Sequence, residues 1–321
     1  MRKIILGFLF VVLACPAWAQ EIYVSGGASR DAKTGTTGGQ WSVTYAEGLG
    51  EHLEWSLTYL NEGHQPNHYR DGLAPQIWGR TNILDRRLSL ALGVGPYAYF
   101  DTKLTGTRDI YSNANGWGII SSAAATWYGA SPLLFRLRLN YIETQHSFDA
   151  FSLVLGIGYQ FGAPSPAGPL PRPPNQTKPT TENEITAFLG QTVLNSAKSE
   201  TGTAVSVEYR RGLTHHFDWT IAWLNEGDSR PIGRQGVMTQ LWAVRAFLDD
   251  HLALGVGGGP YLAQDKYSGD DGQRTTLAGA VSLTAAYRFH ANWGIRATWH
   301  RIITDYSRDT DVFMGGLTYR F

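Results

Sequence analysis

The sequence predicts an all-β protein made of two tandem eight-stranded antiparallel transmembrane β-barrels, for three reasons. Apolar and polar residues alternate with a period of two over most of the chain, which is typical of strands. The pattern occurs twice, because the Leu-Asn-Glu-Gly of 60–63 returns at 224–227, an offset of 164 residues. Beyond the N-terminal segment no run of about 18 apolar residues occurs, whereas transmembrane strands need only about 9–11 alternating residues.

Residues 1–19 are predicted to be an export signal peptide. Arg2 supplies a positive start, residues 4–14 are apolar, and an A-x-A cleavage site ends at Ala19. An alternative is a lipoprotein signal in which Cys15, the only cysteine, becomes the acylated first residue. Cleavage after Ala19 would leave a mature chain without disulfide or thiol chemistry.

The first barrel repeat, residues 20–161, is predicted to contain eight strands. In the third, the large apolar side chains of Leu53, Trp55 and Leu57 alternate with Glu54 and Ser56. The strands are expected near 21–30, 38–47, 53–62, 73–83, 87–100, 115–128, 133–144 and 151–161.

The two faces of these strands differ in a way that favours a membrane. One face is large and apolar with aromatic residues at the strand ends, and the other is small or polar. A water-soluble barrel would carry many Lys and Glu residues outside, whereas charged residues are only 17% of this chain. Apolar outside with Trp and Tyr at the strand ends is the lipid-facing arrangement. An eight-stranded barrel closes without unpaired edges, and side chains fill its interior.

Residues 162–183 contain seven prolines and are predicted to be an extended linker. The second repeat, residues 184–321, follows the first at an offset of 164 that changes to 160, as in Arg136 and Arg296. The alternative is one sixteen-stranded barrel, in which 162–183 would be a hairpin turn. The other turns expected on that side are short, which favours two barrels.

These features resemble the small eight-stranded outer-membrane barrels of Gram-negative bacteria, present here as a tandem duplication. The matching features are the signal peptide, eight alternating segments per repeat, and the ending Leu317-Thr318-Tyr319-Arg320-Phe321. A terminal Phe with an aromatic residue two positions earlier is similar to the outer-membrane assembly signal, and 159–161 carries its counterpart. The resemblance implies a location in the bacterial outer membrane, with outer-membrane lipid and lipopolysaccharide as partners.

Charged residues at inward positions are expected to plug each lumen. Acids of the third strand and arginines of the seventh would meet across a narrow barrel, because buried charges must be paired or hydrated. The expected lumen residues are Glu54, Glu62, Arg136, Arg138, Asp218, Glu226 and Arg296.

An enzymatic alternative follows from the same resemblance, which includes lipid A deacylases and acyltransferases. Such enzymes place a Ser/His/acid set near the outer leaflet, where a base must reach the serine. The deacylases carry a His-x-Ser pair that neither repeat has, and neither candidate histidine is present in both repeats. The candidates are His146, Ser147, Asp149, His300, Ser307 and Asp309.

Composition limits the remaining function classes. Lys+Arg and Asp+Glu are both 27, so no strong field favours nucleic acid. No metal site and no cofactor are expected, since His64 and His68 flank a loop sequence. The favoured function is a structural or surface-binding outer-membrane protein whose outer loops meet an extracellular ligand. A lipid-modifying hydrolase or acyltransferase and a passive pore are the alternatives.

Overall fold

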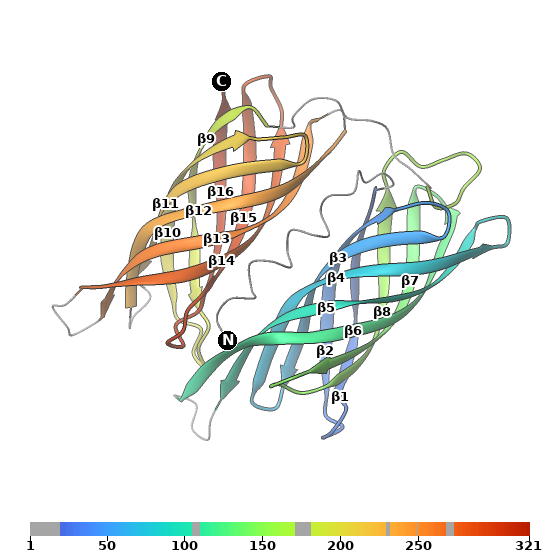
Figure 1. Ribbon diagram of the computed structural model, residues 1–321, viewed down its shortest axis with the longest axis horizontal. Coiled ribbons are helices and arrows are strands. Elements are labelled where there is room, and N and C mark those ends of the chain that lie inside the picture. Colours follow the sequence, from blue (N-terminus) through green and yellow to red (C-terminus); the bar gives the residue numbers. More distant parts are fainter. Residues whose placement is uncertain (1–19, 105–109, 171–180, 229–231, 249, 268–272) are drawn as a thin grey trace. The chain divides into compact units, whose positions relative to one another are not determined.

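The computed structural model describes residues 20–104, 110–170, 181–228, 232–248, 250–267 and 273–321. It contains two closed antiparallel barrels of eight strands each, which confirms the predicted fold class (Figure 1). The sixteen-stranded alternative is wrong, because strand β1 pairs with β8 and strand β9 pairs with β16. The predicted signal peptide and Cys15 lie outside the described residues.

Barrel one is a simple meander in which each strand pairs with the next strand of the chain. Closure between its first and last strands leaves no edge with unpaired backbone groups. Its strands are β1 Gln20–Asp31, β2 Thr37–Gly48, β3 Leu53–Gln65, β4 His68–Ile83, β5 Leu88–Leu104, β6 Tyr111–Ala130, β7 Leu133–Thr144 and β8 Ala150–Gln160.

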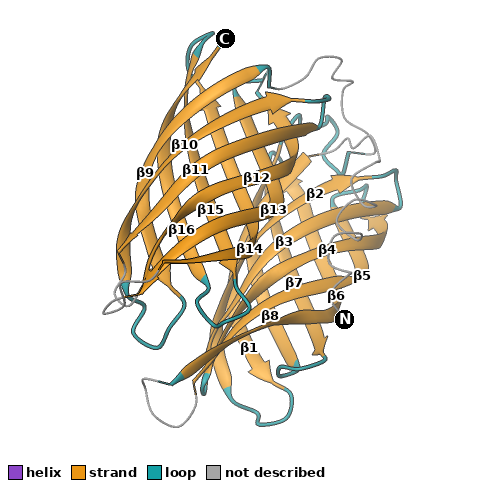
Figure 2. Cartoon of the chain, turned by 60° about the vertical axis from the view of Figure 1, so that its left-hand side comes forward, coloured by secondary structure: helices purple, strands orange, loops and turns teal. Residues whose placement is uncertain are grey.

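Barrel two repeats this order, and in Figure 2 the described residues of both barrels are strands and loops. Among the described residues no helix is long and apolar enough to cross a membrane. The strands of barrel two are β9 Asn183–Leu194, β10 Thr201–Gly212, β11 Phe217–Asp228, β12 Ile232–Phe247, β13 Leu252–Tyr267, β14 Gln273–Arg288, β15 Trp293–Ile303 and β16 Thr310–Arg320.

Large apolar side chains point out of the barrels and small or polar ones point in. In β8 the alternation is complete: Leu155 is 68% exposed and Ile157 61%, whereas Ser152 is 6% and Gln160 0% exposed. Aromatic pairs stand at the strand ends, such as Tyr45 with Trp55. The sequence pattern therefore predicted the two faces correctly.

One end of each barrel has connections of at most four residues, and most connections at the other end are longer. One end, called the turn end below, holds the strand-terminal residues Gln20 and Gln160 and the short connections 49–52, 84–87 and 131–132. Its counterpart in barrel two holds the connections 213–216, 248–251 and 289–292. The opposite end is called the loop end.

The strands expected near 53–62 and 73–83 are too short, because β3 continues to Gln65 and β4 begins at His68. The strand continues through a β-bulge at the repeated Leu-Asn-Glu-Gly. Gly63 adopts φ +70° and its N–H donates to Asn61 Oδ1 at 3.0 Å; Gly227 adopts φ +73° and donates to Asn225 Oδ1 at 2.8 Å. The bulge shifts the register with the partner strand and increases local twist.

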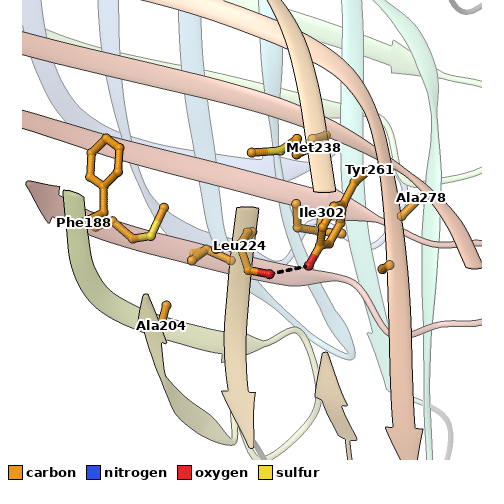
Figure 3. Close-up of a cluster of buried hydrophobic side chains, with 11 residues drawn as sticks. Phe188, Ala204, Leu224, Met238, Tyr261, Ala278 and Ile302 are labelled. Atoms are coloured by element: carbon orange, nitrogen blue, oxygen red, sulfur yellow. Dashed lines mark hydrogen bonds between the residues drawn. The ribbon is translucent and has the colours of Figure 1, made fainter. Parts of the chain in front are cut away.

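A cluster of apolar side chains fills part of the interior of barrel two. Phe188, Leu224, Met238, Tyr261 and Ile302 meet there, and each is at most 5% exposed (Figure 3). The Tyr261 hydroxyl donates to the Leu224 carbonyl at 3.3 Å (Figure 3). Smaller clusters occupy the interior of barrel one.

Candidate functional site

The polar lumen of barrel one begins at the turn end with ionic contacts between opposite walls. Strands β3 and β7 are four strands apart in a closed ring of eight, so they face one another. The Glu54 carboxylate of β3 accepts two hydrogen bonds. Arg136 Nη2 of β7 donates to Oε1 at 3.2 Å, and Arg80 Nη1 donates to Oε2 at 3.0 Å. The Arg136 guanidinium also lies 4.0 Å from the centre of the Tyr23 ring. Side chains of the two walls therefore meet across this level of the lumen.

Arg138 crosses the middle of the same lumen with neutral partners. Its Nε donates to Asn140 Oδ1 at 2.6 Å and its Nη1 to Thr58 Oγ1 of the opposite wall at 3.1 Å. Its Nη2 donates to Gln76 Oε1. The guanidinium lies over the Trp78 ring, 5.1 Å from its centre. Amide and hydroxyl oxygens accept the hydrogen bonds that the Arg138 guanidinium would otherwise donate to water.

Glu62 organises a third level at the loop end. Its carboxylate accepts from Arg70 Nε at 2.5 Å and Nη2 at 2.8 Å, and from the Tyr97 hydroxyl at 2.8 Å. Arg70 in turn donates to Ser147 Oγ at 3.1 Å and to the Phe148 carbonyl. Its guanidinium lies 3.6 Å from the centre of the Phe148 ring. Arg70 thus ties the barrel wall to the β7–β8 loop that covers this mouth.

The loop end of barrel two carries the same charged set at an offset of 164 residues. Arg234 Nε donates to Asp265 Oδ1 at 2.7 Å, and Nη1 lies 3.7 Å from Glu226 Oε2. Its Nη2 donates to the Tyr306 hydroxyl at 3.0 Å and to the Arg308 carbonyl at 3.2 Å. Arg308 stands where barrel one has Phe148, so both arginines donate to the same carbonyl of their loops. Burial raises the pKa of Tyr306 to about 12, so its hydroxyl stays a donor, and it donates to Asp265.

At the turn end of barrel two, the acid of the third strand and the arginine of the seventh do not pair with each other as expected. Arg296 Nη2 donates to Glu184 at 2.6 Å, and Asp218 accepts from Arg210 Nη1 at 3.3 Å. The structure therefore brings an acid of the third strand and an arginine of the seventh into an ion pair in barrel one only. The Arg210 guanidinium lies 4.4 Å from the centre of the Trp242 ring. In barrel one the corresponding tryptophan, Trp78, is instead contacted by Arg138.

The first catalytic candidate set is not arranged as a relay. The Asp149 carboxylate accepts from the Thr144 backbone N–H at 2.9 Å, which closes its own loop. Ser147 Oγ donates to Asp101 Oδ2 at 2.7 Å, and His68 Nδ1 lies 2.8 Å from the same oxygen. His146 is exposed. An acid stands between serine and histidine here, whereas nucleophile activation requires the histidine between them.

The second candidate set is divided between lumen and loop. His300 is buried inside barrel two, and its Nδ1 bonds to Ser282 Oγ at 2.6 Å. Ser307 lies in the loop after β15 with φ +57°. The Asp309 carboxylate accepts from the Thr304 N–H at 2.7 Å, as Asp149 does in its own loop. Within the described ranges no three His, Cys, Asp or Glu side chains are arranged to hold a metal.

Sequence reasoning missed the residues that complete the loop-end sets. The expected lumen residues included neither the arginines Arg70 and Arg234 nor the acids Asp101 and Asp265. Each pair recurs at the offset of 164, as Tyr97 and Tyr261 also do. A search for identical polar residues at that offset, independent of the predicted loop boundaries, would have found them.

No protein-family description and no curated protein matches this chain. Several solved structures are similar to part of it. The N-terminal β-barrel domain of Pseudomonas aeruginosa OprF is 12% identical over 44% of this chain and 99% of that one, with a TM-score of 0.36. Neisserial surface protein A is 9% identical over 44% of this chain and 97% of that one, with a TM-score of 0.36. The Yersinia pestis outer membrane protein Ail is 15% identical over 44% of this chain and 100% of that one, with a TM-score of 0.30.

Proposed function

We propose that the protein is a non-conducting outer-membrane protein with a structural or surface-binding role, carried out by two plugged barrels and their loop ends. The observation that carries the proposal is the contact between opposite walls of barrel one. Arg136 reaches Glu54 and Arg138 reaches Thr58 across the full width of the lumen. Interior side chains that bond across the barrel support a plugged lumen over an open pore.

The outer walls support a place in a lipid bilayer. Leu92 is 72% exposed, Leu155 68% and Leu277 73%, and an outward-facing band of such side chains is typical of a barrel wall in contact with lipid. Most connections at the loop end are longer than those at the turn end, and in outer-membrane barrels the short connections face the periplasm. On this basis the turn ends are periplasmic and the loop ends face outward. Lipid and lipopolysaccharide would contact the walls, and an extracellular ligand would meet the loops.

The arginine contacts at both loop ends support a surface-binding role over an enzymatic one. Arg70 and Arg234 each donate to a buried carboxylate of the barrel wall and to a backbone carbonyl of the loop at their mouth. A rigid loop is a better binding surface than a mobile one, because less conformational entropy is lost on association.

Planar-bilayer recording tests the proposal. Full-length protein, shown by flotation to be inserted in the lipid, is expected to give no steady conductance steps. A variant with Glu54→Ala, Arg136→Ala and Arg138→Ala removes the contacts across barrel one and is expected to leak ions. A large steady conductance from the unmodified protein would overturn the proposal.

A further inference from the structure

The segment that follows β8 lies across the turn end of barrel one. Gln160 Nε2 donates to the Gly168 carbonyl at 3.1 Å, and Arg86 Nη2 donates to the Pro169 carbonyl at 2.6 Å. The carbonyl of the next residue accepts from Arg80 Nη2 at 3.4 Å. Three successive carbonyl oxygens of this segment therefore meet three donors of the barrel.

Three different elements of the barrel hold these donors. Arg80 lies in β4, Arg86 lies in the β4–β5 connection, and Gln160 ends β8. The Arg80 side chain is 1% exposed and Gln160 is 0% exposed. Arg86 also pairs with Glu51 Oε2 at 3.2 Å. The closed sheet therefore holds the donors in place, and what they contact is peptide backbone.

The Gly-Pro step of the segment fits this mouth. Gly168 and Pro169 are both buried. Gly168 has φ +154°, and a Cβ at this position would lie 2.9 Å from Arg86 Cβ, so both the dihedral angle and the close approach favour glycine. Pro169 has a carbonyl acceptor but no N–H, so its burial leaves no backbone donor without a partner. The mouth therefore favours an extended segment in which proline follows glycine.

Residues 165–170, called the linker start below, do not use every polar group of the mouth. Gln160 Oε1, Arg86 Nε and Asn82 Oδ1 are buried atoms without a hydrogen-bond partner among the described residues. A buried polar atom without a partner is costly. A peptide that reaches these atoms as well can therefore replace the linker start.

The residues that donate in barrel one are replaced in barrel two. Val244, Asp250 and Arg320 occupy the equivalent positions, at offsets of 164, 164 and 160 residues. Asp250 pairs with Arg288 at 2.7 Å, and Arg320 pairs with Glu182 at 3.2 Å, so these charged side chains pair with one another. Of the two turn ends, only that of barrel one carries the set of donors that binds backbone carbonyls.

We propose that the turn-end mouth of barrel one is a binding site for an extended peptide that contains Gly-Pro, and that the linker start occupies this site. A Gly-Pro segment of another chain competes with the linker start, because its carbonyl oxygens fit the same three donors. Proline limits the unbound conformations of such a segment, so less entropy is lost on binding. The site lies at the turn end and is independent of the role proposed for the loop ends.

Fluorescence anisotropy of a labelled peptide tests the site in the full-length protein folded in detergent. The probe is Ser-Pro-Ala-Gly-Pro-Leu, the sequence of residues 165–170, labelled at its N-terminus and amidated at its C-terminus. In a vacated variant these six residues are replaced by alternating glycine and serine, which places serine at 168. The vacated variant is expected to bind the probe at least about tenfold more tightly than the unmodified protein, because the tethered linker start competes in the latter. Equal affinities, or no binding by the folded vacated variant, would refute the proposal.

A change in the probe and a change in the mouth locate the contacts. A probe with alanine in place of glycine is expected to bind the vacated variant at least about tenfold more weakly, because its Cβ meets Arg86. Arg86→Ala in the vacated variant is expected to weaken the original probe at least about threefold, since a donor to a carbonyl is lost. The control is Arg211→Ala, which removes an exposed arginine at the turn end of barrel two and is expected to change the affinity less than about twofold. Equal effects of the two arginine substitutions would place the probe elsewhere and contradict the proposal.

Discussion

Buried carboxylates at each loop end position the arginine that holds the adjacent loop: Glu62 holds Arg70, and Asp265 together with Glu226 holds Arg234. Glu62 and Arg70 are both 0% exposed at their side chains, and the carboxylate fills two of the guanidinium donor directions. A buried guanidinium without its carboxylate would keep its charge, because arginine does not lose its proton under ordinary conditions. The pair therefore acts as a unit, and removing one member leaves a desolvated charge.

Replacing Glu62 by Ala is expected to lower the free energy of unfolding by about 3–5 kcal/mol, the usual cost of an uncompensated buried charge. Urea unfolding of the protein folded in lipid vesicles measures the change. The matched control is Glu143→Ala, an exposed carboxylate of the same barrel, with an expected change within about 0.5 kcal/mol. Equal effects of the two substitutions would show that the ion pair contributes nothing.

His216 is a titrating residue in the β10–β11 connection, outside the strands. Burial, the nearby Arg245 charge and His215 lower its pKa to about 4, from 6.5 for the free side chain. The unfolded chain therefore binds more protons than the folded one between these two values. The stability that His216 contributes is complete above pH 6.5 and is lost as the pH falls toward 4.

His216→Gln is expected to reduce this pH dependence, because glutamine does not titrate. Urea midpoints at pH 7 and pH 4.5 are compared for both proteins. The unmodified protein should lose more stability over this interval than the variant. Identical losses would mean that His216 does not differ between the folded and unfolded states.

At the scale of elements, the repeated Leu-Asn-Glu-Gly forms a β-bulge in strands β3 and β11. Both glycines have positive φ, and a Cβ on Gly63 would lie 1.9 Å from the Gly39 carbonyl oxygen. Only glycine fits this combination of dihedral angle and close approach. The bulge interrupts the regular register at the point where Glu62 enters the loop-end charged set.

Gly63→Ala is expected to destabilise barrel one by about 2 kcal/mol or more, since it adds a strained dihedral and a steric clash with backbone. Gly79→Ala is the control, because a Cβ at Gly79 meets nothing within 4 Å. Urea unfolding of each variant checks both values. A tolerated alanine at Gly63 would show that the bulge relaxes without cost.

At the scale of the whole molecule, the chain consists of two closed sheets that share no strand. Each ring satisfies its own backbone hydrogen bonds and contains its own buried side chains. The linker ends take part in these bodies: Gly168 bonds to Gln160, and Thr181 Oγ1 donates to Asp218 at 2.8 Å. Each described end of the linker therefore bonds to the barrel that it adjoins.

Fragments 20–170 and 181–321 are each expected to fold alone in the detergent that folds the full chain. Folded barrels migrate differently from unfolded ones on electrophoresis without heating, and this shift measures the outcome. The full chain is the reference for complete folding. If either fragment remains unfolded, that barrel depends on its neighbour.

The sequence by itself determined the number of strands, their direction and the faces of each strand. These follow from a local rule, because a period of two places every second side chain on one face. The inward position of Glu54, Arg136 and Arg296 followed from the same parity.

Only the tertiary structure decided which inward groups meet. Arg138 reaches across to Thr58, Glu62 selects Arg70, and Asp218 pairs with Arg210 although Arg296 was expected. The alternation along a strand shows whether a side chain points inward or outward, but not its position along the barrel axis, because neighbouring strands are staggered. A long arginine side chain can also reach partners above or below its own position along that axis. The bulge at Gly63 also shifts the register beyond it. The lumen contacts therefore depend on closure of the barrel, which brings together strands far apart in the sequence.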